Sequence, residues 1–160
     1  MKRLLFMIAA LIVSVSMEAQ TDVISVKDAI QVFKNKTLAA GKKVLEKQGY
    51  TYKGVSSDQF GKDYNWVRNM DLSKDFLPTA LGKGNSSLFM LAVDSRMVYL
   101  YVFNRSAFEG LKAQAKRLGY DMGKALKTSE GTIICTKDEQ PTLTFMELQQ
   151  PLPYCMQITE

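Results

Sequence analysis

The same short pattern occurs twice in the chain, at an offset of 70 residues, and it limits the possible folds more than any other feature. Gly49-Tyr50 follows one amphipathic helical pattern and Gly119-Tyr120 follows another. Glycine accepts the left-handed conformation that ends many helices, and after each pair the apolar residues change from helical spacing to alternation. We therefore predict an internal duplication, with tandem units over about 25–104 and 105–160.

Each predicted unit begins with a capping box, a serine followed three residues later by an acidic residue, in which the two side chains satisfy unpaired backbone donors. The helices that follow are expected over Val26–Val44 and Ser106–Leu118. Gly41 is expected either to bend the first helix or to divide it into two shorter ones. The capping pairs are Ser25 with Asp28, and Ser106 with Glu109.

Four strands are predicted after each helical region, because apolar residues alternate there between turn residues. An antiparallel sheet of such strands needs one face covered, and the helices supply the cover. The expected fold is α+β: two tandem α-β-β-β-β repeats in a two-layer domain with the helices on one sheet face. A long loop over 71–87 separates two strands of the first unit. The predicted strands are Tyr50–Val55, Tyr64–Met70, Leu88–Val93, Met97–Phe103, Tyr120–Leu126, Thr132–Thr136, Thr142–Leu148 and Tyr154–Ile158.

This order of elements, with Gly49-Tyr50 and Gly119-Tyr120 at matching places, resembles the β-lactamase-inhibitor-protein fold and small PepSY-like secreted proteins. The resemblance is one of topology and covers nearly all of residues 22–160. It implies one curved sheet with helices on the convex side and an open concave face that grips a partner. Such proteins often have two short helices per repeat, and here the second unit has room for one.

The first nineteen residues have the pattern of a secretory signal peptide. Lys2 and Arg3 precede an apolar run over 4–15, which is too short to span a bilayer as a helix, and Ala19 is the preferred cleavage site. We expect a single domain over 20–160, periplasmic or secreted, which meets the membrane only through the cleaved segment. The net charge of +5 is spread along the chain, and no nucleic-acid motif is present, so nucleic acid is not an expected partner.

Candidate binding residues come from strand alternation, which sorts side chains by sheet face. Over Met97–Phe103 the aliphatic residues point one way and the aromatic ones the other. Aromatic residues and arginine are enriched at binding hot spots, so we predict partner contacts by Tyr99, Tyr101, Phe103 and Arg68. The competing interpretation is that the aromatic residues are core. Trp66 is expected in the core, on the same strand face as Arg68.

Much catalytic chemistry is disfavoured by composition. The chain has no histidine, which removes the commonest general base and most zinc sites. It has no Cys-x-x-Cys pair, and Gly82-Lys83-Gly84 neither follows a buried strand nor opens a helix, as a phosphate-binding loop would. No catalytic residue, cofactor or metal is predicted. Cys135 and Cys155 are expected to be unbridged, because a strand between theirs puts them about 9.5 Å apart.

The leading hypothesis is a non-catalytic, exported binding module, such as an inhibitor, an immunity factor or an envelope adaptor, that presents a sheet face to another envelope or extracellular protein. A second hypothesis is a carrier of an apolar or amphiphilic small molecule, held between the sheet and the 71–87 loop. This hypothesis predicts a cavity of a few hundred Å³. A third is an enzyme without histidine, which predicts clustered carboxylates or lysines with shifted pKa values in a cleft.

Overall fold

The computed structural model describes residues 22–80, 82–94, 96–122 and 131–160. The predicted signal peptide lies outside this range, as does most of the predicted strand Tyr120–Leu126. The elements, in chain order, are α1 (Val26–Asn35), α2 (Leu38–Leu45), the 3₁₀ turn η1 (Glu46–Gln48), β1 (Thr51–Asp58), β2 (Gly61–Arg68), β3 (Ser87–Ala92), β4 (Met97–Val102), α3 (Arg105–Arg117), β5 (Ile133–Cys135), β6 (Thr142–Glu147) and β7 (Tyr154–Thr159).

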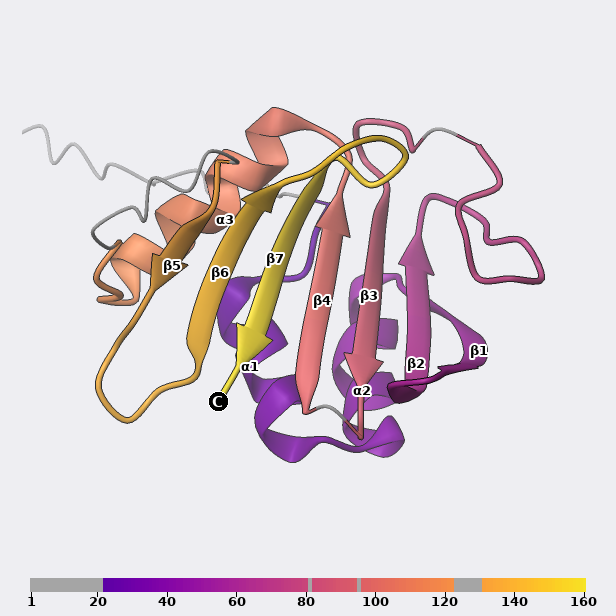
Figure 1. The fold of residues 1–160 in the computed structure, drawn as a ribbon, viewed down its shortest axis with the longest axis horizontal. Coiled ribbons are helices and arrows are strands. Elements are labelled where there is room, and N and C mark those ends of the chain that lie inside the picture. The colour runs from indigo at the N-terminus through magenta and orange to yellow at the C-terminus, as the bar shows by residue number, and fades with distance from the viewer. Residues whose placement is uncertain (1–21, 81, 95, 123–130) are drawn as a thin grey trace, which may run out of the picture.

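The seven strands form one sheet in the order β1-β2-β3-β4-β7-β6-β5. Every neighbouring pair is antiparallel, so the predicted α+β class is confirmed. β4 and β7, the last strands of the two predicted units, are neighbours in the middle of the sheet. In Figure 1 the three α-helices lie behind the strands, and the opposite face of the sheet is turned toward the viewer. We call that opposite face the open face.

A row of apolar side chains shows which sheet face packs on the helices. One residue from each of the seven strands contributes to it, and the central members are completely buried. The row meets buried residues of α1, α2 and α3 in a single hydrophobic core. Trp66 belongs to it, as expected. Its members in strand order are Tyr52, Trp66, Phe89, Leu100, Met156, Phe145 and Ile133.

The first helical region is divided, but not at Gly41. Its capping serine behaves as predicted: the Asp28 amide donates to Ser25 Oγ at 3.1 Å. Lys36 then adopts a left-handed φ of 52° and ends α1, and Thr37 Oγ1 accepts from the Ala40 amide to begin α2. Gly41 lies inside α2, where the Trp66 ring leaves no space for a side chain. The glycine therefore serves packing, and the break occurs where a threonine can start a new helix.

The predicted capping box of the second unit is wrong. Asn104, not Ser106, is the N-cap of α3: its Oδ1 accepts from the Ala107 amide at 2.6 Å, and Ser106 lies inside the first turn. Asparagine caps helices as well as serine does, and Asn104 lies two residues after the end of β4. The N-cap therefore lies two residues upstream of the predicted capping serine, and the helix begins at Arg105.

The two Gly-Tyr pairs have matching geometry. Gly49 and Gly119 have φ values of 82° and 84°, and each following tyrosine amide donates back into its helix, to Leu45 O and Ala115 O. Both tyrosines are buried. The Tyr50 hydroxyl bonds Ser87 Oγ at the start of β3 at 2.7 Å, and the Tyr120 hydroxyl donates to Pro141 O just before β6 at 2.9 Å.

Candidate functional site

The open face carries a patch of half-buried aromatic and sulfur-containing side chains at its centre. Tyr99 and Tyr101 are two residues apart on β4, so their side chains share this face. Their rings are stacked, with centroids 6.2 Å apart and planes 8° from parallel. Met97 lies on the same face of β4, and the neighbouring strands add one residue each, Met90 from β3 and Gln157 from β7, opposite Tyr99. We call the set the tyrosine patch. It consists of Met90, Met97, Tyr99, Tyr101 and Gln157.

Tyr99 and Gln157 form weak hydrogen bonds to one sulfur within the tyrosine patch. The Tyr99 hydroxyl donates to Met97 Sδ at 3.2 Å, and Gln157 Nε2 donates to the same sulfur at 3.5 Å. A thioether is a weak acceptor, so both polar groups are available to a stronger partner. Burial raises the pKa of Tyr101, and the neighbouring Cys155 thiol and Tyr99 hydroxyl add to the rise. Tyr101 is therefore a neutral hydroxyl at physiological pH.

The other two predicted contact residues do not join this patch. Phe103 follows the end of β4 and packs on Gly82, where a Cβ would overlap its ring. Arg68 lies on the helix-covered face with Trp66, and its guanidinium donates to Asp22 Oδ1 at 3.0 Å. The structure thus brings together Tyr99 and Tyr101 and gives Phe103 and Arg68 other contacts.

Both cysteines are free and buried. Their strands, β5 and β7, are separated by β6, which is the arrangement from which unbridged cysteines were predicted. They also lie on opposite sheet faces, since Cys135 pairs with Leu143 in the core and Cys155 pairs with Tyr101 on the open face. Burial raises the pKa of Cys135 to about 11 and that of Cys155 to about 12, so neither thiol is an activated nucleophile.

Carboxylates gather at one end of β2. Partial burial raises the pKa of Asp63, and the nearby Asp58 and Asp94 carboxylates raise it further. Asp94 is engaged in structure, because its Oδ2 accepts from the Lys62 amide at 2.9 Å. Within the described ranges no group of three or more His, Cys, Asp or Glu side chains is placed to hold a metal ion.

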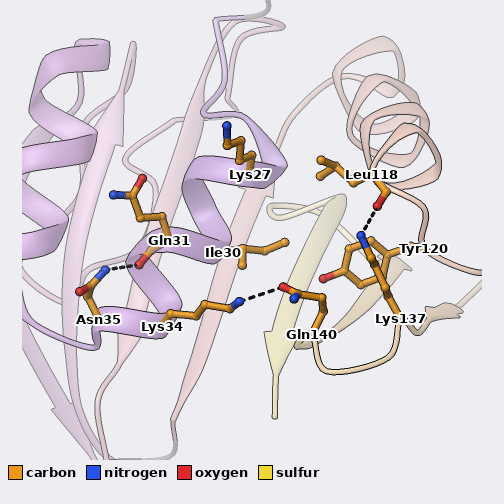
Figure 2. Close-up of a pocket in the computed structure, with 9 residues that line it drawn as sticks. All are labelled: Lys27, Ile30, Gln31, Lys34, Asn35, Leu118, Tyr120, Lys137 and Gln140. Carbon is orange, nitrogen blue, oxygen red and sulfur yellow. Dashed lines mark hydrogen bonds between the residues drawn. The ribbon is translucent and has the colours of Figure 1, made fainter.

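The helix side of the molecule has a groove of about 370 Å³ between α1 and the segments that follow α3. Figure 2 shows side chains of α1 on one side and Leu118, Tyr120, Lys137 and Gln140 on the other. A ligand cavity was predicted between the sheet and the 71–87 loop, and this groove lies at a different place. We call it the lysine groove, and its described lining is Lys27, Ile30, Gln31, Lys34, Asn35, Leu118, Tyr120, Lys137 and Gln140.

Sequence reasoning missed the lysine groove because its two walls are far apart in the chain. Lys34 and Gln140, which are hydrogen-bonded across it at 2.8 Å, are separated by 106 residues. No local spacing connects them, and the lysines looked like part of an evenly spread charge. No local pattern indicates which α1 residues Gln140 would face.

Comparisons of the chain with protein-family models, with curated proteins and with solved structures found no match. Among the described residues no helix is long and apolar enough to cross a membrane.

Proposed function

We propose that the protein is an exported, non-catalytic binding module whose open sheet face binds another envelope or extracellular protein through the tyrosine patch. The observation that carries this is the stacked pair Tyr99 and Tyr101, half-buried at the centre of a sheet face that no described helix covers. Stacked rings on a strand are rigid, so little conformational entropy is lost when a partner packs on them.

The composition of the patch supports the same proposal. Tyrosine and methionine are enriched in the buried centres of protein interfaces, where charged residues are depleted. The five residues of the tyrosine patch include no charged side chain. Tyr99 and Gln157 offer hydrogen-bonding groups that now contact only a sulfur, so a partner that supplies a carbonyl or carboxylate oxygen would improve those bonds.

We also propose that the chain is a tandem duplication that forms a two-layer domain, with the layout of the β-lactamase-inhibitor-protein fold. In support, the strands on the two sides of the central β4–β7 pair follow matching orders: β3, β2 and β1 lie outward from β4, and β6 and β5 lie outward from β7. Gly49-Tyr50 and Gly119-Tyr120 make corresponding bonds at the start of β3 and just before β6. In such a layout the open face is the one left for a partner.

Export by a cleaved signal peptide is part of the proposal. The charged start, short apolar run and small residue at Ala19 support it. The mass and N-terminal sequence of the protein recovered from the periplasm or medium would test it. A product that begins at Gln20 is expected, whereas an intact Met1 in a cytosolic fraction would contradict export.

The binding proposal is tested by capture from envelope and culture-medium proteins. The immobilised parent is compared with Tyr99→Ser/Tyr101→Ser and with the control Phe60→Ser, which removes an aromatic ring that is 72% exposed in the turn between β1 and β2. A protein retained by the parent and the control but lost from the double variant is the expected result. Equal retention by all three, or no retained protein, would contradict binding through the patch. Circular dichroism of each variant checks that it is folded.

A further inference from the structure

The lysine groove lies on the opposite side of the sheet from the tyrosine patch, so a ligand bound in it would be independent of the proposed function. One wall is the exposed side of α1, and the other is formed by the end of α3 and the turn before β6. Figure 2 shows Ile30 reaching from α1 toward Leu118 and Tyr120. Its volume of about 370 Å³ falls within the range of small-molecule sites, about 300–1,000 Å³.

Positive charge in the lysine groove is not neutralised by the described residues. Lys34 Nζ donates to Gln140 Oε1 at 2.8 Å, and Lys137 Nζ donates to Leu118 O at 2.6 Å, so both ammonium groups are held by neutral acceptors. No described carboxylate lines the groove, and Lys27, Lys34 and Lys137 take part in none of the ion pairs within the described ranges.

Lys34 and Lys137, each bonded to a neutral acceptor, are positioned to bind a ligand. A lysine has three donors, and each of these uses one on its neutral partner, which orients the ammonium group and leaves further donors for an anion. A charge-assisted hydrogen bond to an anion is about twice as strong as a neutral one. An entering anion would therefore gain stronger bonds without the prior breaking of an ion pair.

Beneath the lysines the groove is apolar. Ile30 and Tyr120 are buried, and Leu118 is half-buried. The Tyr120 hydroxyl is already committed to Pro141 O, so the ring is what remains for a ligand to contact. A small inorganic anion would bond the lysines but leave the apolar surface exposed to water. An apolar molecule would cover that surface but leave the lysines without an anionic partner.

We propose that the lysine groove binds a small amphiphilic carboxylate, with its carboxylate between Lys34 and Lys137 and its hydrocarbon part against Ile30, Leu118 and Tyr120. Both halves of the ligand are then matched, one by charge and the other by apolar burial. The amides of Gln31, Asn35 and Gln140 complete the polar rim.

The test uses decanoate as the probe and its uncharged analogue decanamide as the control, below their aggregation limits, with the purified protein. Binding is measured by calorimetry and mapped by amide chemical shifts. Saturable decanoate binding, with shifts at Ile30 and Tyr120, is expected. A charge-assisted bond contributes about 1.5–3 kcal/mol, so decanamide should bind about tenfold or more weakly.

Variants separate the site from general charge. Lys34→Gln and Lys137→Gln should each weaken decanoate binding by about tenfold, because each removes one charged donor. Lys43→Gln, an equal charge change at an exposed position of α2, should leave the dissociation constant unchanged. Thermal unfolding of each variant confirms that the fold is retained.

Several results would overturn the proposal. Equal affinity for decanoate and decanamide would remove the role of the lysines, and equal loss in Lys43→Gln would reduce the effect to net charge. Displacement of decanoate by inorganic phosphate at a similar concentration would show a simple anion site without an apolar component. Failure of decanoate to bind, or shifts confined to the open face, would exclude the groove.

Discussion

Gly41 lies so close to the indole ring of Trp66 that a Cβ on residue 41 would be 2.6 Å from Cη2 and 2.7 Å from Cζ2. Trp66 is completely buried and belongs to the row of large side chains that continues through Phe89 and Leu100. The ring is held edge-on by Phe89, with centroids 6.1 Å apart. The approach of α2 to the sheet therefore depends on the absence of a side chain at residue 41.

Gly41→Ala is expected to destabilise the protein. In an exposed helix this change would stabilise by about 1 kcal/mol, but here the added methyl group overpacks the core, which costs about 1–3 kcal/mol. The free energy of unfolding, from chemical denaturation, should fall. In a Trp66→Phe background the smaller ring lacks both clashing atoms, so the same substitution should cost less. Equal losses in the two backgrounds would exclude the Trp66 contact as the cause.

Tyr50→Phe should destabilise the protein more than Tyr120→Phe. The Tyr50 hydroxyl accepts from the Ile24 amide at 3.2 Å as well as bonding Ser87 Oγ, and its loss leaves a buried amide unpaired, at about 1–3 kcal/mol. Tyr120→Phe loses one bond to Pro141 O, or about 1 kcal/mol. Tyr99→Phe, which loses only a contact to sulfur, is the control and should change the free energy of unfolding least. The reverse order would contradict these assignments.

Asn104→Ala should destabilise α3, whereas Ser106→Ala should not. Asn104 Oδ1 is the acceptor for the Ala107 amide, and loss of an N-cap side chain costs about 0.5–2 kcal/mol. Ser106 lies in the first turn and is exposed, so its replacement should stay within about 0.5 kcal/mol. Urea denaturation of both variants measures the difference, and a larger effect at residue 106 would restore the capping box predicted from sequence.

The two thiols should resist modification in the native protein. Well below pH 9 both are protonated in the folded and unfolded states. As the pH rises above that value, the unfolded state loses these protons first, because burial raises the native pKa of Cys155 to about 12. Stability should therefore fall from about pH 9 upward, by up to about 1.4 kcal/mol per pH unit for this thiol. Cys155→Ala should flatten that decline.

Thiol titration gives a direct check of the same two residues. A disulfide-exchange reagent at pH 8 should detect almost no thiol in the native protein and two thiols in denaturant, since both cysteines are free and buried. No thiol in denaturant would indicate a bridge, in contradiction to the separation of β5 and β7 by β6.

The alternation and turn residues of the sequence predicted most strands to within a few residues. β3 and β4 occupy Ser87–Ala92 and Met97–Val102, close to the predicted ranges. β4 alternates buried and half-buried residues, as a strand with one buried face does, whereas β3 is a short apolar run that is buried on both faces. The start of α3 was misassigned because serine and asparagine are equivalent caps by composition, and only the path of the chain out of β4 selects Asn104.

By itself, the sequence determined the α+β class, the two Gly-Tyr helix ends and the separation of aliphatic from aromatic residues along β4. Each depends on a conformational or alternation preference within a few residues. Only the tertiary structure decided that Gly41 packs on Trp66, that Arg68 pairs with Asp22, and that Lys34 meets Gln140 across the lysine groove. Those contacts join residues distant in the chain, so they depend on strand order and helix placement, which no local pattern encodes.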